Sequence, residues 1–482
     1  MSNQRLILLI MAAVFINCRG RNQLQGNQEK LAQQITVEDS LLAASAKAMP
    51  QKISKGIQLK ENRSIDKSYP IQLVDIAGQK GDSIDVKLSD IADVTFIPLE
   101  SIPDSSNIGK VTQFVKLTDK YILVYGLSGI YQFGRDGRFI KTIVKNKIDN
   151  INVRVFPGRG SQMSWSSKEV IYDGAIGDIW VKDGFLYYTS YNSETKQYGF
   201  KKYQLNDDRP LGMNGNVEAA RDTLPGKLLQ LFSANAADGF QYRLNRNATT
   251  IPLSGDMFLN VPSAWSNASR GKNVMVGHSD NDSLCGFTNL NPVENYTKRI
   301  IKRGSTRVRR HWYKNMLTIY STFSDTVFRV MPPNRFVPAY VFNFDSLKVT
   351  PNRYFTPGKL HGNLWVSDML VETDEKLLVE YGDVDAKIAF GIYDKNKKHF
   401  QSVNYGKKNR GVVDDILGYG GYWPREINGQ REEAKMVSGI GLKYWVKSDR
   451  FKQAEAQRKE EFERCIHQMK DDNHLLIIYK LK

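Results

Sequence analysis

KVTQFVKLTDKYILVYGLSGIYQFGRDGRFIKTI, residues 110–143, contains four short strand-like runs separated by turns. Residues 110–116 alternate in polarity, residues 121–125 form an apolar run of the buried type, and residues 130–133 and 138–143 continue the pattern. The Asp136-Gly137 pair between the last two runs is a common hairpin turn. Four short strands joined by tight turns form an up-and-down meander, which is one blade of a β-propeller.

Hairpins of the same kind recur along the chain. Buried-type second strands begin near residues 121, 185, 255, 316 and 377, so the spacing is about 60–70 residues. A fixed long period of hairpin units is typical of propellers, and residues 84–482 have room for about six units. The predicted fold is therefore all-β, a six-bladed β-propeller. A two-sheet sandwich, which does not need this period, is the second alternative.

The two ends of the body are predicted to meet. Residues 452–470 are charged and helical in pattern, with Phe462 and Ile466 one turn apart, and they predict one short helix near the C-terminus. Residues 475–481 then form a strong strand. In a propeller, a terminal strand removes free sheet edges when it completes the blade begun at the other end. We expect residues 475–481 to share a blade with strands from the other end of the chain.

The N-terminal residues have the pattern of an export signal. Arg5 precedes eleven apolar residues, 6–16, which as a helix rise roughly 16 Å, about half of a bilayer core. That length suits the apolar region of a signal peptide, and Asn17-Cys18 follows it in the way of a bacterial lipobox. We predict cleavage before Cys18, lipidation of Cys18, and an outer membrane lipoprotein on either the periplasmic or the cell-surface side. A soluble secreted protein is the alternative.

The predicted organisation has three parts. Residues 1–17 are the signal peptide, and residues 18–80, rich in Gln, Asn, Ser and Lys, are a lipid-anchored tether that is mostly disordered and flexible. Residues 81–482 are the propeller, which we expect to be monomeric. Of the other two cysteines, Cys285 and Cys465, neither belongs to a CxxC pair, and whether they form a disulfide stays open.

The chain is basic, with a formal net charge of +17, of which residues 1–17 contribute only Arg5. A basic surface attracts nucleic acid, anionic glycans or lipid headgroups. A dispersed solvated charge is the simpler interpretation, and an exported address argues against nucleic acid as a partner. The six histidines show no ligand spacing, and no GxSxG, P-loop or HExxH motif occurs. The sequence therefore predicts no catalytic residue, metal ligand or cofactor.

Two stretches supply candidate ligand-binding residues. Residues 302–313 are the most basic, and guanidinium groups beside aromatic rings suit carboxylate- or sulfate-bearing glycans. The second stretch, near residue 422, resembles a stacking platform for a sugar. The candidates are Arg307, Arg309, Arg310, Trp312, Tyr422, Trp423 and Arg425. The structural alternatives are an edge strand guarded by charge and aromatic packing between blades.

Several segments resemble the Bacteroidetes lipoproteins described as six-bladed β-propeller proteins of unknown function. The matching segments, in order, are 93–100 (DVTFIPLE), 108–110, 133–140, 324–330 (SDTVFRV), 338–340, 422–424 and 479–482. One departure is the region after residue 143, where residues 146–150 read NKIDN and the family usually has a Gly-Pro-Gly-Glu loop. The resemblance implies a fold and an address, and it brings no established catalytic residues.

The leading functional interpretation is a cell-envelope lipoprotein that acts as a binding or scaffold module for a glycan, a peptide or a partner protein of the envelope. The alternative is a calcium-dependent propeller hydrolase or lyase with its site at the central channel. Three or more carboxylate or amide groups converging at one end of the channel favour the enzyme. A third interpretation is a sensor or assembly subunit that works only through its partner.

Overall fold

The computed structural model describes most of the strands predicted from the sequence. It describes residues 58–59, 71–79, 81, 83–102, 113–126, 128–149, 151–156, 160–165, 171–192, 197–206, 248–253, 258–262, 273–278, 283–288, 308–314, 316–321, 325–331, 335–349, 361–385, 387–404, 411–418, 421–452, 456–469 and 473–482. The predicted signal peptide, Cys18, Arg307 and most of the predicted tether lie outside these residues.

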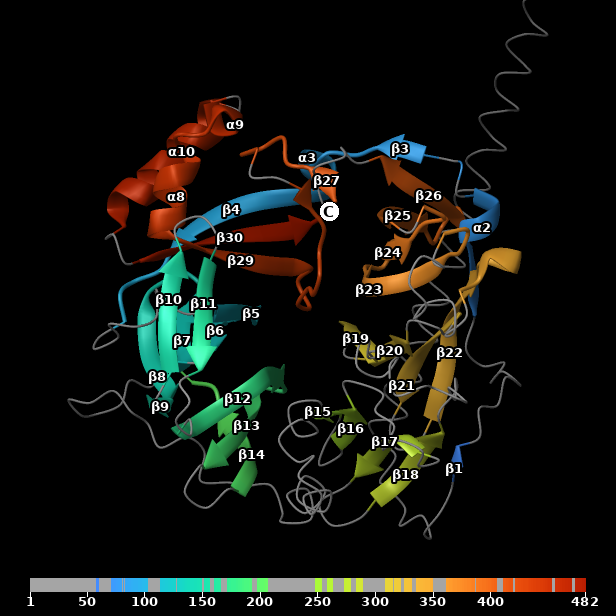
Figure 1. The fold of residues 1–482 in the computed structure, drawn as a ribbon, viewed down its shortest axis with the longest axis horizontal. Helices are drawn as coiled ribbons and strands as arrows, with labels where there is room; N and C mark the ends of the chain where they lie inside the picture. The colour runs from blue at the N-terminus through green and yellow to red at the C-terminus, as the bar shows by residue number, and fades with distance from the viewer. Residues whose placement is uncertain are drawn as a thin grey trace, which may run out of the picture.

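Six larger sheets lie in a ring, each with one strand nearest the centre (Figure 1). The first is the sheet quoted from the sequence, β5 (Gln113–Leu117), β6 (Tyr121–Gly126), β7 (Gly129–Gly134) and β8 (Phe139–Lys145). The second contains β12 (Ile171–Lys182), β13 (Phe185–Asn192), β14 (Gln197–Gln204) and, on the opposite edge, β9 (Lys147–Asp149). The third contains β15 (Ala248–Pro252), β16 (Phe258–Pro262), β17 (Asn273–His278) and β18 (Ser283–Thr288).

The fourth and fifth sheets follow the same antiparallel plan. The fourth contains β19 (Val308–Tyr313), β20 (Met316–Ser321), β21 (Thr326–Met331) and β22 (Arg335–Asn343). The fifth contains β23 (Trp365–Glu372), β24 (Lys376–Gly382), β25 (Ile388–Asp394) and β26 (His399–Asn404). Two small hairpins stand apart from these sheets, β10 (Ile151–Phe156) with β11 (Gly160–Trp165) and β27 (Val412–Val413) with β28 (Gly421–Tyr422).

The sixth sheet joins the two ends of the described chain. It has three strands, β29 (Glu432–Ser438), β30 (His474–Leu481) and β4 (Ala92–Pro98), with β30 in the middle. Ile477 lies opposite Phe96 in β4 and opposite Lys435 in β29. The predicted pairing of the C-terminal strand with the other end of the chain is therefore confirmed.

The expected number of blades is corrected from six to five. Among the described residues, five sheets have at least four strands, as a complete blade does, whereas the closing sheet has three. The even spacing along the sequence predicts how many hairpin units the chain has, but it does not predict how many strands each unit contains. The prediction of an all-β propeller is confirmed, and the number six is wrong.

Three short strands near the N-terminus extend the outer edges of consecutive sheets. The strands β1 (Gln58–Leu59), β2 (Gln72–Asp75) and β3 (Ser83–Asp85) pair in parallel with β18, β22 and β26. Two of them, β1 and β2, lie on the N-terminal side of residue 81, where we expected the tether. The paired part of the chain therefore begins before that boundary.

Helices are few and short, and most of them lie near the closing sheet. They are α2 (Ile76–Gln79), α3 (Leu88–Ile91), the 3-10 helix η4 (Asp345–Leu347), α8 (Gly439–Trp445), α9 (Asp449–Lys452) and α10 (Ala456–Gln468). Near the C-terminus we expected one helix, and the residues described between β29 and β30 form three. In α10, Phe462 is fully buried and its ring meets Phe96 of β4 edge-on, with centroids 5.3 Å apart.

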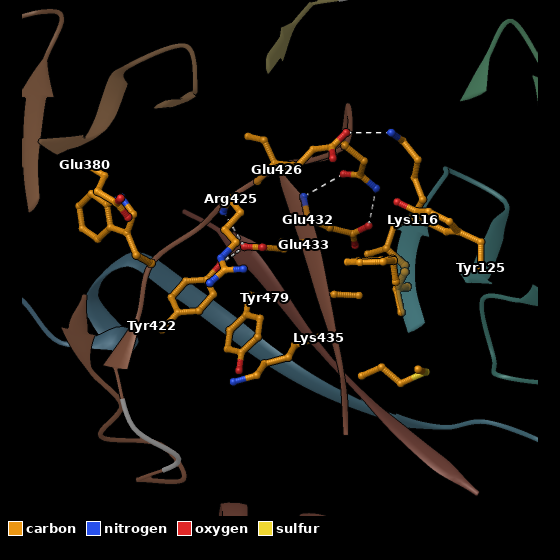
Figure 2. Close-up of a pocket in the computed structure, with 18 of the residues that line it drawn as sticks. Lys116, Tyr125, Glu380, Tyr422, Arg425, Glu426, Glu432, Glu433, Lys435 and Tyr479 are labelled. Carbon is orange, nitrogen blue, oxygen red and sulfur yellow. Dashed lines mark hydrogen bonds and ion pairs between the residues drawn. The ribbon is translucent and has the colours of Figure 1, made fainter. Parts of the chain in front are cut away.

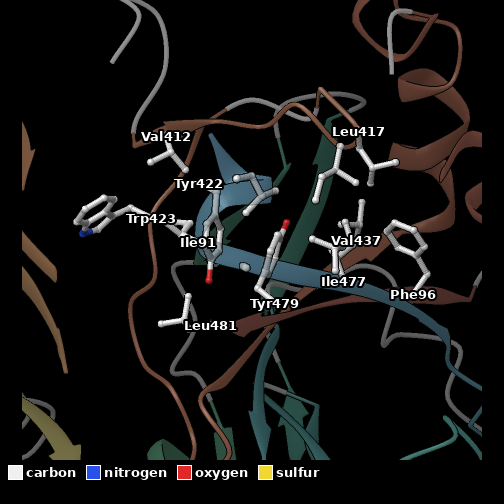
Figure 3. Packing of buried hydrophobic residues seen from close by; sticks show 14 of the residues in the cluster. Ile91, Phe96, Val412, Leu417, Tyr422, Trp423, Val437, Ile477, Tyr479 and Leu481 are labelled. Atoms are coloured by element: carbon white, nitrogen blue, oxygen red, sulfur yellow. The ribbon is translucent and has the colours of Figure 1, made fainter. Parts of the chain in front are cut away.

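Residues of β30 are buried on both faces of the closing sheet. Leu475, Ile477 and Tyr479 pack toward the fifth sheet and the C-terminal helices (Figure 3). Leu476 and Ile478 pack toward the first sheet. Because side chains alternate along a strand, an unbroken apolar run such as residues 475–479 is needed where both faces are covered.

A glycine turn connects the first sheet to the closing sheet. Gly137 has a φ of +86°, and a Cβ at this position would lie 2.3 Å from the carbonyl oxygen of Pro98. The carbonyl of Gly137 also accepts a hydrogen bond from the Glu100 N–H at 2.9 Å. Only glycine combines this backbone conformation with so close an approach.

A buried ion cluster joins the fourth and fifth sheets. The Glu372 carboxylate accepts two hydrogen bonds from the Arg329 guanidinium, at 2.7 and 2.6 Å, and one from the Lys395 ammonium at 2.7 Å. Tyr340 also donates to it, and His311 Nε2 lies 3.2 Å from it. Burial alone raises the pKa of Glu372, but the charges of Arg329 and Lys395 outweigh burial and hold that pKa well below its ordinary value.

Candidate functional site

A cavity of about 420 Å³ lies beside the inner strands β5 and β29, where the first sheet and the closing sheet meet (Figure 2). Its wall also includes residues of the segment between β28 and β29 and Glu380 of β24. The volume falls within the range of about 300–1,000 Å³ found for small-molecule sites. The cavity is therefore the candidate functional site among the residues that the structure describes.

The cavity has one exposed aromatic ring and several buried ones. Phe114 of β5 is 57% exposed, and its ring lies 5.6 Å from that of Tyr125. Tyr422 is buried and stacks on Tyr479 of β30, with centroids 4.1 Å apart and an angle of 19° between the ring planes. Trp423 is also buried and packs on Phe390. The ring with a face open to a ligand is therefore Phe114.

Glu433 is the carboxyl group of this cavity whose pKa is raised by its environment. Its Oε2 accepts one hydrogen bond from the Tyr422 hydroxyl and one from the backbone N–H of Arg425, both at 3.1 Å. Burial raises the pKa of Glu433 to about 7, although these hydrogen bonds and the charge of Arg425 oppose the shift. Glu433 therefore changes its charge near neutral pH.

Two further carboxylates of the cavity, Glu426 and Glu432, are ion-paired. Glu426 accepts a hydrogen bond from Lys116 of β5 at 2.8 Å, and the charge of Lys116 lowers the pKa of Glu426. Glu432 accepts from Arg135 at 2.6 Å and from the Asn428 side-chain amide at 3.0 Å. These two pairs connect the first sheet to the closing sheet and to the segment that precedes it.

Two exposed cations, Arg425 and Lys435, lie on the same wall as Glu433 (Figure 2). Loss of surrounding water lowers the pKa of Lys435, and the positive charge of Arg425 lowers it further. That effect places the two cations within electrostatic range of each other. Such a pair can receive an anionic group.

Beyond Lys116, cations and indole rings from three sheets lie close together. The Trp180 ring of β12 has the Lys116 ammonium 4.8 Å from its centroid and the Arg310 guanidinium of β19 at 4.7 Å. In the same way Lys182 of β12 lies 5.2 Å from the Trp312 ring of β19. Residues of β5, β12 and β19 therefore form cation–ring contacts between different sheets.

The structure brings together some of the residues predicted from the sequence. Tyr422, Trp423 and Arg425 all line the cavity, but the two aromatic residues are buried and form no open platform. Arg310 and Trp312 contact Trp180 and Lys182 of β12. Arg309 is on β19 and half-buried, on the opposite face of that strand from Arg310.

Sequence reasoning missed Phe114, Lys116, Glu426 and Glu433. Phe114 and Lys116 belong to the alternating run 110–116, so the sequence predicts that they lie on one face of a strand. It does not indicate which other segment packs against that face. Glu433 and Lys435 also alternate, in residues 432–438 of the closing sheet. Their importance comes from the arrangement of sheets, which local sequence does not contain.

The described residues contain neither a metal-binding cluster nor a membrane-spanning helix. No group of three or more His, Cys, Asp or Glu residues there has an arrangement that could hold a metal ion. No helix there is long and apolar enough to cross a membrane.

One family model matches most of the chain. It is described as "Domain of unknown function (DUF4933)", and it matches residues 54–413, about three quarters of the sequence. That range contains the first five sheets, with Phe114 and Lys116, and β4 of the closing sheet, but it ends before β29, which contains Glu433, and before β30. A comparison with curated proteins found no match.

Solved structures with some likeness come from bacteria. A Bacteroides fragilis NCTC 9343 protein, named for its expected export, has a TM-score of 0.47 at 13% identity over 86% of this chain and 100% of its own. A Bacteroides thetaiotaomicron VPI-5482 protein of unknown function has a TM-score of 0.35 at 10% identity, over 81% of this chain and 76% of its own. Virginiamycin B lyase from Staphylococcus aureus has a TM-score of 0.26 at 9% identity, over 66% and 90%. These values are low, so the fold described above rests on the strand pairing of this chain itself.

Proposed function

The chain belongs to the DUF4933 family, and we propose that this member is a binding protein of the cell envelope whose channel cavity takes a glycan. The observation that carries the proposal is the combination, in one cavity of about 420 Å³, of an exposed aromatic ring with several charged hydrogen-bonding groups. A sugar presents an apolar face of C–H groups and a rim of hydroxyl groups. The Phe114 ring can pack against the C–H face. The polar groups of Arg425, Glu433 and Lys435 can form hydrogen bonds with the hydroxyl groups of the rim.

The mixed charge of the wall favours a sugar over a purely apolar ligand. Glu426 and Glu432 are held by Lys116 and Arg135, so their carboxylates are fixed in place before a ligand arrives. Groups that are already ordered lose less conformational entropy when a ligand binds. A peptide or a partner protein on the propeller face is the competing occupant, and the experiment below separates them.

The test is a glycan array, followed by titration calorimetry with the strongest binder. Phe114→Ala is expected to weaken binding about tenfold, equal to about 1.4 kcal/mol, because the stacking surface is lost. Tyr444→Ala is the matched control, since Tyr444 is 62% exposed on α8 and does not line the cavity. Unchanged affinity in Phe114→Ala, or retention of peptides but of no glycan, would overturn the proposal.

A hydrolase or lyase is the second candidate function, favoured by the pair Glu426 and Glu433. Their environments move the two pKa values in opposite directions, as acid–base catalysis on a sugar requires. The discriminating measurement is the integrity of the bound oligosaccharide after incubation, with and without calcium. Cleavage that is lost in Glu433→Gln would change the assignment from binding to catalysis.

Location is the second part of the proposal, and it rests on the sequence of residues 5–18. We expect an exported protein anchored by acyl chains on Cys18, which would hold the propeller at the outer membrane. Metabolic labelling with a clickable fatty acid is expected to mark the wild type and not Cys18→Ala. Equal labelling of both would reject the anchor and leave a soluble exported protein.

A further inference from the structure

The carboxyl group of Glu433 is held through only one of its two oxygen atoms. Oε2 accepts hydrogen bonds from the Tyr422 hydroxyl and from the backbone N–H of Arg425, both at 3.1 Å (Figure 2). Oε1 accepts none from the described residues, and the side chain lines the cavity. The carboxyl group is therefore fixed in place while one of its oxygens is left for a ligand.

The two donors that hold Oε2 are themselves fixed. Tyr422 is buried, its ring stacks on Tyr479 with centroids 4.1 Å apart, and its backbone pairs with Val412 of β27. Burial raises the pKa of Tyr422 well above its ordinary value, so the hydroxyl keeps its one proton near neutral pH. That proton is already donated to Glu433, so Tyr422 acts on a ligand only through Glu433.

The charged and titratable groups that face Glu433 come from β28, β29, β30 and the segment between β28 and β29, and they are Tyr422, Arg425, Glu426, Lys435 and Tyr479. The charge of Lys116 lowers the pKa of Glu426, so Glu426 stays ionised near pH 7. Burial raises the pKa of Glu433 to about 7. Of the two carboxyl groups, Glu433 is therefore the one that titrates near neutral pH.

Lys435 is shared between two carboxylates. Loss of surrounding water and the positive charge of Arg425 lower the pKa of Lys435, whereas the charges of Asp414 and Glu433 raise it. Protonation of Glu433 therefore still leaves Lys435 with a negative neighbour.

We propose that Glu433 orients the glycan by accepting a hydrogen bond from a sugar hydroxyl at Oε1, and that Tyr422 is the positioning residue that holds Glu433 for this contact. This inference rests on the proposed glycan-binding function and adds its regulation by pH. An ionised carboxylate accepts a charge-assisted hydrogen bond, roughly twice as strong as one between neutral groups. When Glu433 is protonated, its proton belongs on Oε1, because Oε2 already accepts two hydrogen bonds, and the charge-assisted contact is lost.

The sign of the pH dependence follows from this contact. A sugar hydroxyl bonded to Oε1 favours the ionised form, so binding lowers the pKa of Glu433 from its value of about 7 and releases a proton. Affinity is therefore greatest above pH 7 and falls as the pH drops below 7. A lowering of about one pKa unit on binding makes affinity at pH 6 roughly fivefold weaker than at pH 8.

The binding experiment uses the full chain and the neutral oligosaccharide that binds most tightly in the glycan array, because a neutral probe does not itself titrate. Calorimetry between pH 5.5 and pH 9 is expected to show the roughly fivefold change in the wild type. Glu433→Gln is expected to bind more weakly and equally at every pH, since an amide carries no titrating proton.

Tyr422→Phe tests the positioning role. It removes a donor that stabilises the ionised carboxylate, so the pKa of Glu433 rises and the affinity profile moves upward by about one pH unit. A purely structural role of Tyr422 would lower affinity without moving the profile. Tyr444→Phe is the matched control, because Tyr444 is exposed on α8 and does not line the cavity.

Infrared difference spectroscopy follows the same carboxyl group without a ligand. Spectra of the wild type between pH 6 and pH 8 are expected to contain a protonated-carboxyl C=O band that Glu433→Gln lacks. Saturation with the neutral oligosaccharide at pH 7 is expected to weaken this band, since binding releases the proton.

The outcomes separate this inference from the proposed function. Affinity that does not change with pH, affinity that is higher at pH 6 than at pH 8, or an unshifted profile in Tyr422→Phe overturns the inference and leaves glycan binding in place. Binding confined to acidic glycans also overturns it, because an ionised Glu433 repels them. Absence of binding to every glycan overturns the proposed function itself.

Discussion

Replacement of Glu372 by alanine is expected to lower the free energy of unfolding by about 3–5 kcal/mol, because it leaves two buried cations without their counter-charge. Arg329 and Glu372 have no exposed side-chain surface, and Lys395 is 2% exposed. Water cannot replace the lost carboxylate at such a depth. The cost comes from the groups that remain, since removing one partner of a buried pair is far worse than replacing the whole pair by apolar residues.

Chemical denaturation monitored by tryptophan fluorescence measures this effect. The matched control is Asp385→Ala, because Asp385 pairs with Lys387 on the surface and both side chains are more than 60% exposed. A surface pair of this kind contributes about 0–1 kcal/mol. A loss below 1 kcal/mol in Glu372→Ala would contradict the role of the cluster as a link between the fourth and fifth sheets.

The same cluster makes the wild-type protein sensitive to acid. Burial lowers the pKa of His311, so its stabilising contribution falls as the pH drops below the unfolded value of about 6.5. The pKa of Glu372 is also lower in the folded state, so its contribution is present above about pH 4.3 and is lost as the pH falls further. Both changes act in the same direction, and stability decreases as the pH falls from 7 to 4.

The second large effect is expected at the closing sheet, where Ile477→Asp should cost about 4 kcal/mol or more. Ile477 is fully buried on the central strand β30, so an ionised carboxylate there loses its water. Lys435, which lies opposite it in β29, is exposed and offsets little of that cost. Because β30 joins β29 to β4, the damage opens the ring where the two ends of the chain meet.

Lys480→Gln is the control in the same strand, since Lys480 is the one exposed residue among 474–481 and a neutral replacement brings no like charge opposite Glu432 and Asp93. It is expected to change the unfolding free energy by less than about 0.5 kcal/mol. If Ile477→Asp unfolds at the same denaturant concentration as the wild type, the closing sheet does not hold the ring together.

The strands and turns within one short segment could be predicted from the sequence, whereas most of the pairing and packing between distant segments could not. The meander 113–145 was predicted strand by strand because its turns and alternation lie within one short segment. The pairing of β30 with the other end followed from the general need of a propeller to close. By contrast, β1 and β2 are too short and polar to show a strand pattern, and they gain their partners only from the outer edges of β18 and β22.

The candidate site could likewise be predicted only where its residues are neighbours in the sequence. Tyr422, Trp423 and Arg425 were selected as neighbours in the sequence, and they do line one cavity. Glu433 could not be selected, because its pKa near 7 depends on the burial that Tyr422 and the strands around it create. Arg329 and Glu372 lie in different sheets, and nothing in either segment indicates the other.

The central claim is that the ligand occupies the cavity between β5 and β29, and hydrogen exchange with the strongest glycan binder tests it most directly. Exchange is read by mass spectrometry with and without saturating glycan. We predict slower exchange in residues 113–117 and 421–436, together with no change in α10 on the outside of the closing sheet. Protection confined to α10 or to the outer strands, with none in residues 113–117 and 421–436, would contradict the account.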